Sequence, residues 1–180
     1  MENKMIKELT LDDLSPDLLQ HFNRYQEVKR CWRFEDGEWV LKDISYTHQW
    51  DENTKKNIAT EGFTDYINSG GFVWGVFNDN NQLIAFATLL SDFFGSENQY
   101  IQLSLLHVSC GYRNQGIGRQ LFKLCAEKAK SIGAKKLYIS TNPSEESQIF
   151  YKNVGCVDAE EINQKLAENE PLDRQLEFVL

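Results

Sequence analysis

The amino-acid sequence predicts an α/β fold, in which a mixed and largely antiparallel sheet carries helices on both faces. Two apolar segments, Phe72–Phe77 and Leu83–Leu90, are separated by a polar turn, which is typical of an antiparallel hairpin. Further along, the strand-like segment Tyr100–Ser109 is followed by an amphipathic helix and a second strand-like segment, Lys136–Thr141. A crossover of this kind joins parallel strands. With 180 residues, of which 41% are hydrophobic, we expect a single domain over 1–180.

Composition excludes several classes of function. The net charge of −8 argues against a nucleic-acid partner. No apolar run reaches the roughly 18 residues that span a bilayer, and the first residues lack an apolar signal core, so we expect a cytoplasmic protein without membrane association. The four cysteines form no CxxC pair and the chain has only three histidines, which predicts free thiols and no metal site.

The N-terminal third begins with a predicted strand at Ile6–Leu9. The tripeptide Ser-Pro-Asp at 15–17 predicts a helix start, with Ser15 as N-cap and Pro16 in the first turn. The apolar face of that helix would consist of Leu18, Phe22 and Tyr25.

A turn at Asp36–Gly37 lies between two aromatic segments and predicts a small hairpin or an ordered loop. Aromatic rings beside carboxylates can bind an organic cation, so Trp32, Glu35 and Trp39 are candidate residues for an acceptor substrate. The alternative is a small cluster of core residues under a loop.

The segment 51–68 has a helical pattern with a weak point at Gly62, and Gly70–Gly71 ends it. The hairpin described above follows, and a turn at 93–98 leads into the strand that begins near Tyr100. Three consecutive antiparallel strands are therefore expected before the crossover.

Within Tyr100–Ser109 the apolar side chains occupy odd positions up to Leu105 and even positions from Leu106. A change of parity predicts a β-bulge near Leu105 or Leu106. Such a bulge would leave backbone groups unpaired, to which an extended ligand could bind. The alternative is a strand that is buried on both faces and needs no alternation.

The loop between this strand and the next helix contains Gly116 and Gly118, flanked by Arg113 and Arg119. Glycines allow a ligand to approach the backbone, and the free N–H groups at a helix N-terminus suit a phosphate. The arginines add positive charge. The loop lacks the Gly-Lys-Ser/Thr of a P-loop, and Leu121 stands where a dinucleotide-binding loop needs its third glycine.

After this loop the pattern predicts an amphipathic helix that ends at Gly133, followed by the strand Lys136–Thr141. The next helix starts at Asn142 or at Ser144, either of which can serve as N-cap. Two predicted strands complete the chain, Cys156–Glu161 and Gln175–Leu180. Residues 162–171 between them are expected to form a loop or a short helix. The buried face of the amphipathic helix would consist of Ile117, Leu121, Phe122, Cys125, Ala129 and Ile132.

At these residues the chain resembles the GNAT superfamily of acyl-CoA N-acyltransferases. The family signature, Arg/Gln-x-x-Gly-x-Gly/Ala, is matched by Arg113–Gly118. A second element, Phe-Tyr-x-x-x-Gly-Phe, is matched by Phe150–Cys156, with Cys156 in place of the last phenylalanine. The resemblance covers Tyr100–Val157 and has no anchor in the N-terminal third.

The resemblance implies a GNAT-like sheet, in which a central parallel pair of strands splays apart and the pantetheine arm of coenzyme A enters the cleft. It implies acetyl-CoA as cosubstrate and no metal. The implied donor-site residues are Leu106, His107, Val108, Arg113, Asn114, Gln115, Gly116, Ile117, Gly118, Arg119 and Ser144.

Acetyl transfer to an amine needs a polarised thioester carbonyl, a proton acceptor and a proton for the departing thiolate. Tyr151 of the Phe-Tyr element is the candidate general acid, and its alternative role is that of a core aromatic. Gln102 occupies the position at which some family members place a glutamate, so the general base is left unassigned. The other candidates are His107, Asp92, Glu97 or a chain of water molecules, and Cys110 could carry the acyl group only with a base that we do not identify.

The expected function is therefore transfer of an acetyl group from acetyl-CoA to a primary amine by direct attack. The alternative is a CoA-binding sensor or interaction domain without catalytic activity, and a nucleotide or other phosphate-bearing cofactor is a third hypothesis. The acceptor would be a small-molecule or peptide amine, and a homodimer is compatible with the sequence. Neither the acceptor nor the preferred acyl chain length can be named, because specificity lies in the segments without motifs.

Overall fold

The computed structural model describes residues 4–180, in which a seven-stranded mixed sheet has the strand order β1-β4-β5-β6-β7-β9-β8. Strands β6 and β7 are its parallel pair, and the other neighbours are antiparallel. The bounds are β1 Met5–Glu8, β4 Phe72–Phe77, β5 Leu83–Leu89, β6 Tyr100–Val108, β7 Lys136–Thr141, β8 Val157–Asp158 and β9 Arg174–Val179. The predicted mixed sheet, largely antiparallel with one central parallel pair, is confirmed.

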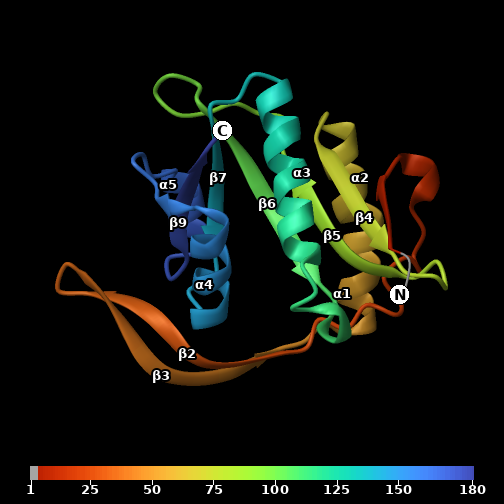
Figure 1. Cartoon of the computed structure of the whole chain (residues 1–180), viewed down its shortest axis with the longest axis horizontal. Helices are drawn as coiled ribbons and strands as arrows, with labels where there is room; N and C mark the ends of the chain where they lie inside the picture. Colours follow the sequence, from red (N-terminus) through yellow and green to blue (C-terminus); the bar gives the residue numbers. More distant parts are fainter. Residues whose placement is uncertain (1–3) are drawn as a thin grey trace.

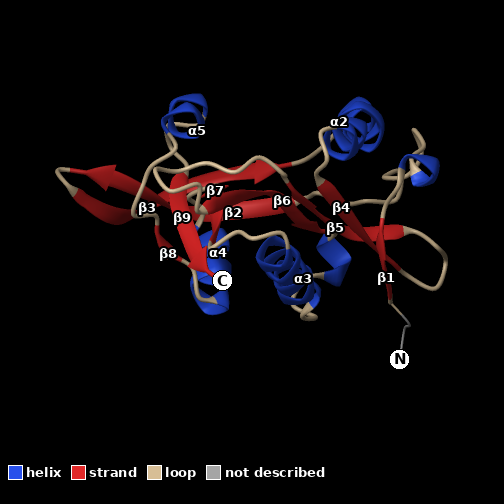
Figure 2. Ribbon diagram, turned by 90° about the horizontal axis from the view of Figure 1, so that it is seen from above, coloured by secondary structure: helices blue, strands red, loops and turns tan. Residues whose placement is uncertain are grey.

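Helices cover both faces of the sheet, as predicted (Figure 2). Helices α3 and α4 lie on one face, and α2 and α5 lie on the other. A π-helix at Ile58–Gly62 separates α1 from α2. This irregularity ends at Gly62, the weak point that the sequence predicted. The bounds are α1 Glu52–Asn57, α2 Phe63–Asn68, α3 Ile117–Ser131, α4 Glu145–Val154 and α5 Gln164–Asn169, with 3₁₀ turns at Leu11–Asp13 and Cys110–Tyr112.

Strands β6 and β7 pair over only three residues each, from Tyr100↔Lys136 to Gln102↔Tyr138, and then diverge (Figure 1). On its other side β6 stays paired with β5, but Thr88 opposes Leu105 while Leu89 opposes Leu103. Ser104 is therefore the extra residue of a β-bulge. The predicted bulge is confirmed, one residue before the expected position.

The bulge changes which alternate residues of β6 point to each face of the sheet. Before it, Ile101 and Leu103 belong to the core under α3 and α4; after it, Leu106 and Val108 pack on that same core. Leu105 packs on the second core, between the sheet and α2. The change of parity in the sequence thus reflects one extra residue and not a strand buried on both faces.

The predicted helix start at Ser-Pro-Asp 15–17 is wrong. Residues 16–21 form turns, in which N–H groups bond to carbonyls three residues back, such as Leu18 to Ser15 at 3.1 Å and Phe22 to Leu19 at 2.9 Å. The buried side chains are Leu19 and Phe22, at a spacing of three, whereas Tyr25 is exposed. The segment therefore follows the core surface without completing a helical turn.

The hairpin predicted at Asp36–Gly37 is far longer than its turn signal indicated. Strands β2 Gln26–Glu35 and β3 Glu38–His48 form a separate two-stranded sheet. Its middle docks at the start of α4, where the Trp32 N–H donates to the Pro143 carbonyl at 2.8 Å and the Tyr46 hydroxyl donates to Asn142 at 2.9 Å. The hairpin extends past α4 along the lower edge of the molecule in Figure 1.

Helix α4 begins with Ser144 as N-cap, whose hydroxyl accepts from the Ser147 N–H. Asn142 instead accepts from the Ser144 N–H at 2.9 Å. Of the two predicted caps, the second is confirmed, because Pro143 stays outside the helix.

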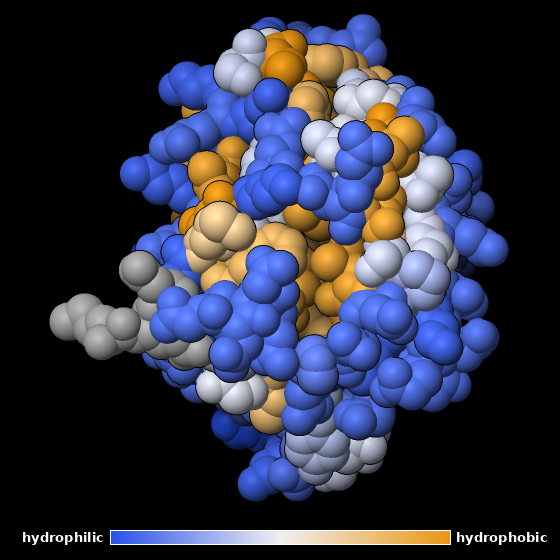
Figure 3. Space-filling model, turned by 90° about the vertical axis from the view of Figure 1, so that its right-hand side faces the viewer, coloured by the Kyte–Doolittle hydropathy of each residue, from blue (hydrophilic) through white to orange (hydrophobic). Residues whose placement is uncertain are grey.

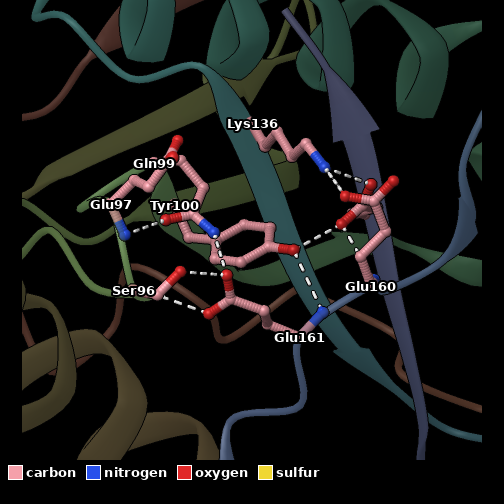
Figure 4. A network of polar contacts seen from close by, with 8 residues as sticks. Ser96, Glu97, Gln99, Tyr100, Lys136, Glu160 and Glu161 are labelled. Atoms are coloured by element: carbon pink, nitrogen blue, oxygen red, sulfur yellow. Dashed lines mark hydrogen bonds and ion pairs between the residues drawn. The ribbon is translucent and has the colours of Figure 1, made fainter.

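A network of polar side chains fixes the closed end of the β6–β7 pair (Figure 4). The Tyr100 hydroxyl donates to Glu177 of β9, a carboxylate that is only 2% exposed. Lys136 of β7 pairs with Glu177 at 2.8 Å and with Glu160 at 2.6 Å. The pKa of Glu177 is lowered despite its burial, because Lys136 and Tyr100 stabilise the ionised form. Three adjacent strands are thereby joined at one point.

The opposite edge of the sheet is formed by β1. Figure 3 shows this side of the molecule, where hydrophobic atoms are exposed in a narrow hollow between hydrophilic ones. Met5 and Ile6 of β1 are exposed. The strand has only four residues, which limits the length of unpaired edge.

We expect Lys136→Met to lower the free energy of unfolding by roughly 3 kcal/mol, because it leaves the buried Glu177 carboxylate without its cation. Urea unfolding at pH 7 measures the change. Lys136→Met combined with Glu177→Gln should recover part of the loss, and the exposed Lys123→Met is the control. A loss below about 0.5 kcal/mol for the single variant would contradict the assigned role.

Candidate active site

A cavity of about 1310 Å³ lies where β6 and β7 diverge. It is bounded by the second half of β6, the loop before α3, the end of β7, helix α4, the start of the β2–β3 hairpin and the segment around α5. Its wall includes Arg24, Glu27, His48, Gln102, Leu106, His107, Val108, Arg113, Gly116, Arg119, Ser140, Glu146, Tyr151, Glu170 and Asp173.

The backbone of β6 presents unpaired groups to this cavity. The Ser109 N–H donates to Ile84 of β5 at 2.8 Å, and opposing residues in an antiparallel ladder alternate between bonded and non-bonded pairs. The amides of Leu106 and Val108 consequently point away from β5, toward the side where β7 has diverged. Two N–H groups on one strand are thus available to an extended ligand.

The loop before α3 places the helix N-terminus at the cavity. Gly116 is the N-cap with a φ of 81°, and a Cβ added there would meet no atom within 4 Å. The first intrahelical bond at this end runs from the Gln120 N–H to the Gly116 carbonyl at 3.1 Å. The amides of Ile117, Gly118 and Arg119 therefore precede the internal ladder, and free N–H groups at a helix N-terminus suit an anion.

Gly118 serves packing as well. A Cβ at this position would lie 3.2 Å from the ring of Phe150, the aromatic residue that precedes Tyr151. The two sequence motifs thus meet in space, since the glycine of the loop lets α4 approach α3.

The guanidinium of Arg113 is bound within the protein. Its Nε donates to the Val108 carbonyl at 3.0 Å and its Nη2 donates to the Arg24 carbonyl at 3.1 Å. Arg113 therefore positions the end of β6 and acts on an anion through its charge. Arg119 is exposed at the cavity edge and can reach a ligand directly.

Arg24 is a cavity residue that no sequence pattern indicated. Burial and the nearby charge of Arg113 lower its pKa to about 10, and its guanidinium lies 5.6 Å from the Trp50 ring. Together with Arg113 and Arg119 it makes this end of the cavity positive.

Tyr151 reaches the cavity from α4. Its ring lies edge-on to Phe150 at 5.0 Å and to Phe122 at 6.4 Å. Burial, and to a lesser extent the thiols of Cys156 and Cys125, raise the pKa of its hydroxyl well above the ordinary value of 10. The hydroxyl is therefore protonated at neutral pH and can donate a proton or a hydrogen bond.

His107 lies on the opposite face of β6 from Val108, as its parity predicted. Its ring packs edge-on against Trp50 at 5.1 Å and in a tilted arrangement against Phe86 at 5.5 Å. Burial, together with the charges of Arg24 and Arg113, lowers its pKa to about 3. The imidazole is neutral at physiological pH and a weak proton acceptor.

Four carboxylates belong to the cavity wall: Glu27 on β2, Glu146 on α4, Glu170 after α5, and Asp173 before β9. Asp173 is half-buried, and burial together with the charge of Glu170 raises its pKa to about 6. These residues carry no motif, and only the tertiary fold brings them to the site.

A comparison with protein families matches the Acetyltransferase (GNAT) family over residues 25–156. The chain belongs to the GNAT acetyltransferase family.

Solved structures of GNAT acetyltransferases have the same fold at low sequence identity. A putative streptothricin acetyltransferase from Bacillus anthracis str. Ames, in complex with acetyl coenzyme A, superposes with a TM-score of 0.72 at 20% identity, over 97% of this chain and 96% of that chain. Nourseothricin acetyltransferase gives 0.64 at 13% identity, over 97% and 95%. A GNAT family acetyltransferase from Elizabethkingia anophelis with acetyl-CoA bound gives 0.59 at 22% identity and covers 100% of both chains. A search of curated protein sequences found no significant match.

Most of the residues expected from the GNAT resemblance line the cavity: Leu106, His107, Val108, Arg113, Asn114, Gly116, Ile117, Gly118, Arg119 and Tyr151. Gln115 does not, because its side chain bonds to Lys4 at 2.6 Å and to the Gly111 carbonyl at 3.3 Å. Ser144 does not either, since it is buried as the cap of α4.

The residues considered for the acceptor lie outside the cavity wall. Glu35 pairs with Lys42, and Trp39 packs against Phe34 and under Arg174. Both side chains therefore have contacts within the protein, at the outer end of the β2–β3 hairpin. Trp32 lies on the same hairpin, also outside the wall.

A group of metal ligands and a membrane-spanning helix are both absent from the residues that the structure describes. Among residues 4–180, no three His, Cys, Asp or Glu side chains are grouped so as to hold a metal ion. Over the same residues, every helix is too short or too polar to cross a bilayer.

Proposed function

We propose that this GNAT protein transfers an acetyl group from acetyl-CoA to a primary amine by direct attack. The observation that carries the proposal is the conjunction, in one cavity, of unpaired β6 amides, a helix N-terminus and a buried tyrosine hydroxyl. The two structural neighbours that contain acetyl-CoA support the choice of donor.

The donor would extend along the gap between β6 and β7. The Leu106 and Val108 amides would bond to the pantetheine arm as an additional strand does, and the amides at the start of α3 would bind the pyrophosphate. Arg119 would add a charge-assisted hydrogen bond. Acetyl-CoA supplies the thioester, and a backbone amide near Val108 would polarise its carbonyl.

Tyr151 would protonate the departing thiolate. Its hydroxyl is held by the packing of its ring against Phe150 and Phe122, and its raised pKa keeps it protonated across the physiological range. A general acid that is protonated before the C–S bond breaks avoids release of a free thiolate into a buried site.

The acceptor would be a cationic small-molecule amine. The wall residues Glu27, Glu146, Glu170 and Asp173 would attract positive charge, and the arginines of the wall would attract phosphate. The neighbours named for streptothricin and nourseothricin support an acceptor of this kind.

One observation favours the alternative of a CoA-binding domain without activity. Gln102 stands in the cavity wall where some GNAT enzymes place a glutamate, and its amide cannot accept a proton. The two functions differ in thiol release, which only the enzyme shows in the presence of an amine.

We expect Arg119→Glu to weaken acetyl-CoA binding by roughly 10- to 100-fold, because it replaces a charge-assisted contact with repulsion of the pyrophosphate. Isothermal titration calorimetry measures the Kd. Lys123→Glu, with the same change of charge one turn along α3 and outside the cavity, is the matched control. Equal binding by both variants would place the phosphates elsewhere.

We expect Tyr151→Phe to lower kcat roughly 100-fold or more, while the Kd for acetyl-CoA stays within about twofold. The variant removes the proton donor and keeps the ring that packs against Phe122. Thiol release in the presence of streptothricin or spermidine measures the rate.

Tyr46→Phe is the control for that experiment, because Tyr46 lies outside the cavity wall and loses only a hydroxyl that donates to Asn142. Because burial raises the pKa of Tyr151 above 10, no loss of activity between pH 7 and 9 should be attributable to its deprotonation. Unchanged kcat in Tyr151→Phe would show that another group protonates the thiolate.

A further inference from the structure

Asp173 reaches the cavity from the face of the sheet opposite Tyr151. We propose that Asp173 is the general base of acetyl transfer, and that it accepts the proton from the acceptor amine on the α5 face of the sheet. The inference rests on the proposed function and assigns a role that neither sequence motif supplies.

The register of β7 and β9 defines the two faces. Ser140 opposes Gln175 in the β7–β9 ladder, so both side chains lie on the same face. Tyr138 lies there too, and its hydroxyl accepts from the Asn163 N–H at 2.9 Å, at the start of α5. The intervening Ile139 belongs to the core under α3 and α4, on the face from which Tyr151 enters. Figure 2 shows α4 and α5 on opposite sides of the sheet.

The gap between β6 and β7 thus has Tyr151 on the α4 side and Asp173 on the α5 side. An amine that attacks a thioester approaches one side of the carbonyl, and the sulfur must be protonated elsewhere. A cavity wall with Tyr151 on the α4 side and Asp173 on the α5 side supplies these two proton transfers at separate places.

A chain of hydrogen bonds holds Asp173 in position and fixes its direction. The Tyr138 hydroxyl receives the Asn163 N–H and donates to Gln175 Oε1 at 2.7 Å. Gln175 Nε2 donates to Ser140 Oγ at 2.9 Å, and Ser140 Oγ donates to Asp173 Oδ2 at 3.4 Å. Ser140 Oγ accepts from Gln175, so its own hydrogen is free to donate to Asp173, which suits an ionised carboxylate.

The charges around Asp173 suit a base. Burial, and then the charge of Glu170 on the same segment, raise the pKa of Asp173 to about 6, while the Ser140 hydroxyl opposes that shift. The adjacent Arg174 is engaged by Asp158 at 2.8 Å and lies over the Trp39 ring at 4.7 Å. Asp173 is ionised at pH 7 and is a stronger proton acceptor than an ordinary aspartate.

The proposed step accounts for every bond, electron pair and proton. The lone pair of the neutral amine forms the N–C bond, the C–S bond breaks, and its electron pair stays on sulfur. The nitrogen, which becomes acidic once it is bonded to the carbonyl carbon, transfers one proton to Asp173. Tyr151 transfers one proton to the thiolate. The products are the N-acetyl amine and CoA thiol, and exchange of one proton each with solvent restores both residues.

The other candidate bases fit the geometry less well. His107 packs among aromatic rings and its pKa is lowered to about 3. Asp92 and Glu97 are not in the cavity wall.

The test compares Asp173→Asn with the wild-type protein, using streptothricin and spermidine as acceptors. Ionisation of the amine affects both proteins equally, so the ratio of their kcat/KM values isolates the base. We expect a ratio of roughly 100 or more above pH 7, which shrinks about tenfold per pH unit as the pH falls below about 6, because Asp173 is then protonated. The Kd for acetyl-CoA should change less than twofold.

Two further variants should shift that pH dependence in opposite directions. Ser140→Ala removes a hydrogen bond that lowers the pKa of Asp173 and should move the acidic limb to higher pH. Glu170→Gln removes a charge that raises the pKa and should move the limb to lower pH. A merely structural role for Asp173 would produce neither shift.

Asp92→Asn, an exposed aspartate outside the cavity, is the matched control and should leave kcat/KM unchanged. A ratio near one for Asp173→Asn, in a protein that releases thiol with an amine, would overturn this inference and leave the proposed function intact. Acetyl-CoA binding without thiol release for either acceptor in the wild type would overturn both.

Discussion

Strand β6 cannot keep two neighbours along its whole length, and this constraint determines the site. The extra residue at Ser104 keeps β6 in register with β5 but exchanges its faces, while β7 stays paired only as far as Gln102 and Tyr138. Beyond that point the N–H groups of Leu106 and Val108 have lost their neighbouring strand. Unpaired backbone groups inside a protein are costly unless water or a ligand satisfies them. A binding cleft therefore arises from the sheet itself.

The divergence of β6 and β7 needs a firm closed end, and the polar network around Glu177 provides it. Tyr100, Lys136 and Glu177 come from the three adjacent strands β6, β7 and β9, so the strands are joined where pairing stops (Figure 4). At the open end, Arg113 binds the Val108 carbonyl, and the β2–β3 hairpin docks on the start of α4. The wall of the cavity between these supports includes residues of α3 and α4, on one face of the sheet, and of α5, on the other.

The sequence predicted the parts of this arrangement that depend on local physics. The bulge followed from a change of apolar parity, the glycine loop from its motif, and α3 from its periodicity. The helix predicted to start at Ser-Pro-Asp 15–17 was wrong because its cap signals were local, whereas the burial of Leu19 and Phe22 determined the backbone conformation. Asp173 and Arg24 carry no local signal at all. The relation of Asp173 to Ser140 depends on the pairing of β7 with β9, and such long-range pairing cannot be read from a single sequence.

The central claim, that the bulged strand offers its Leu106 and Val108 amides to the donor, is tested most directly by residue-resolved amide hydrogen exchange with and without acetyl-CoA. The alternating ladder predicts fast exchange at both residues in the free protein and strong protection, by roughly tenfold or more, in the complex. The His107 amide, which points to β5, is the internal control and should be protected in both states. Protection of Leu106 and Val108 before acetyl-CoA is added, or no change on its binding, would contradict the account.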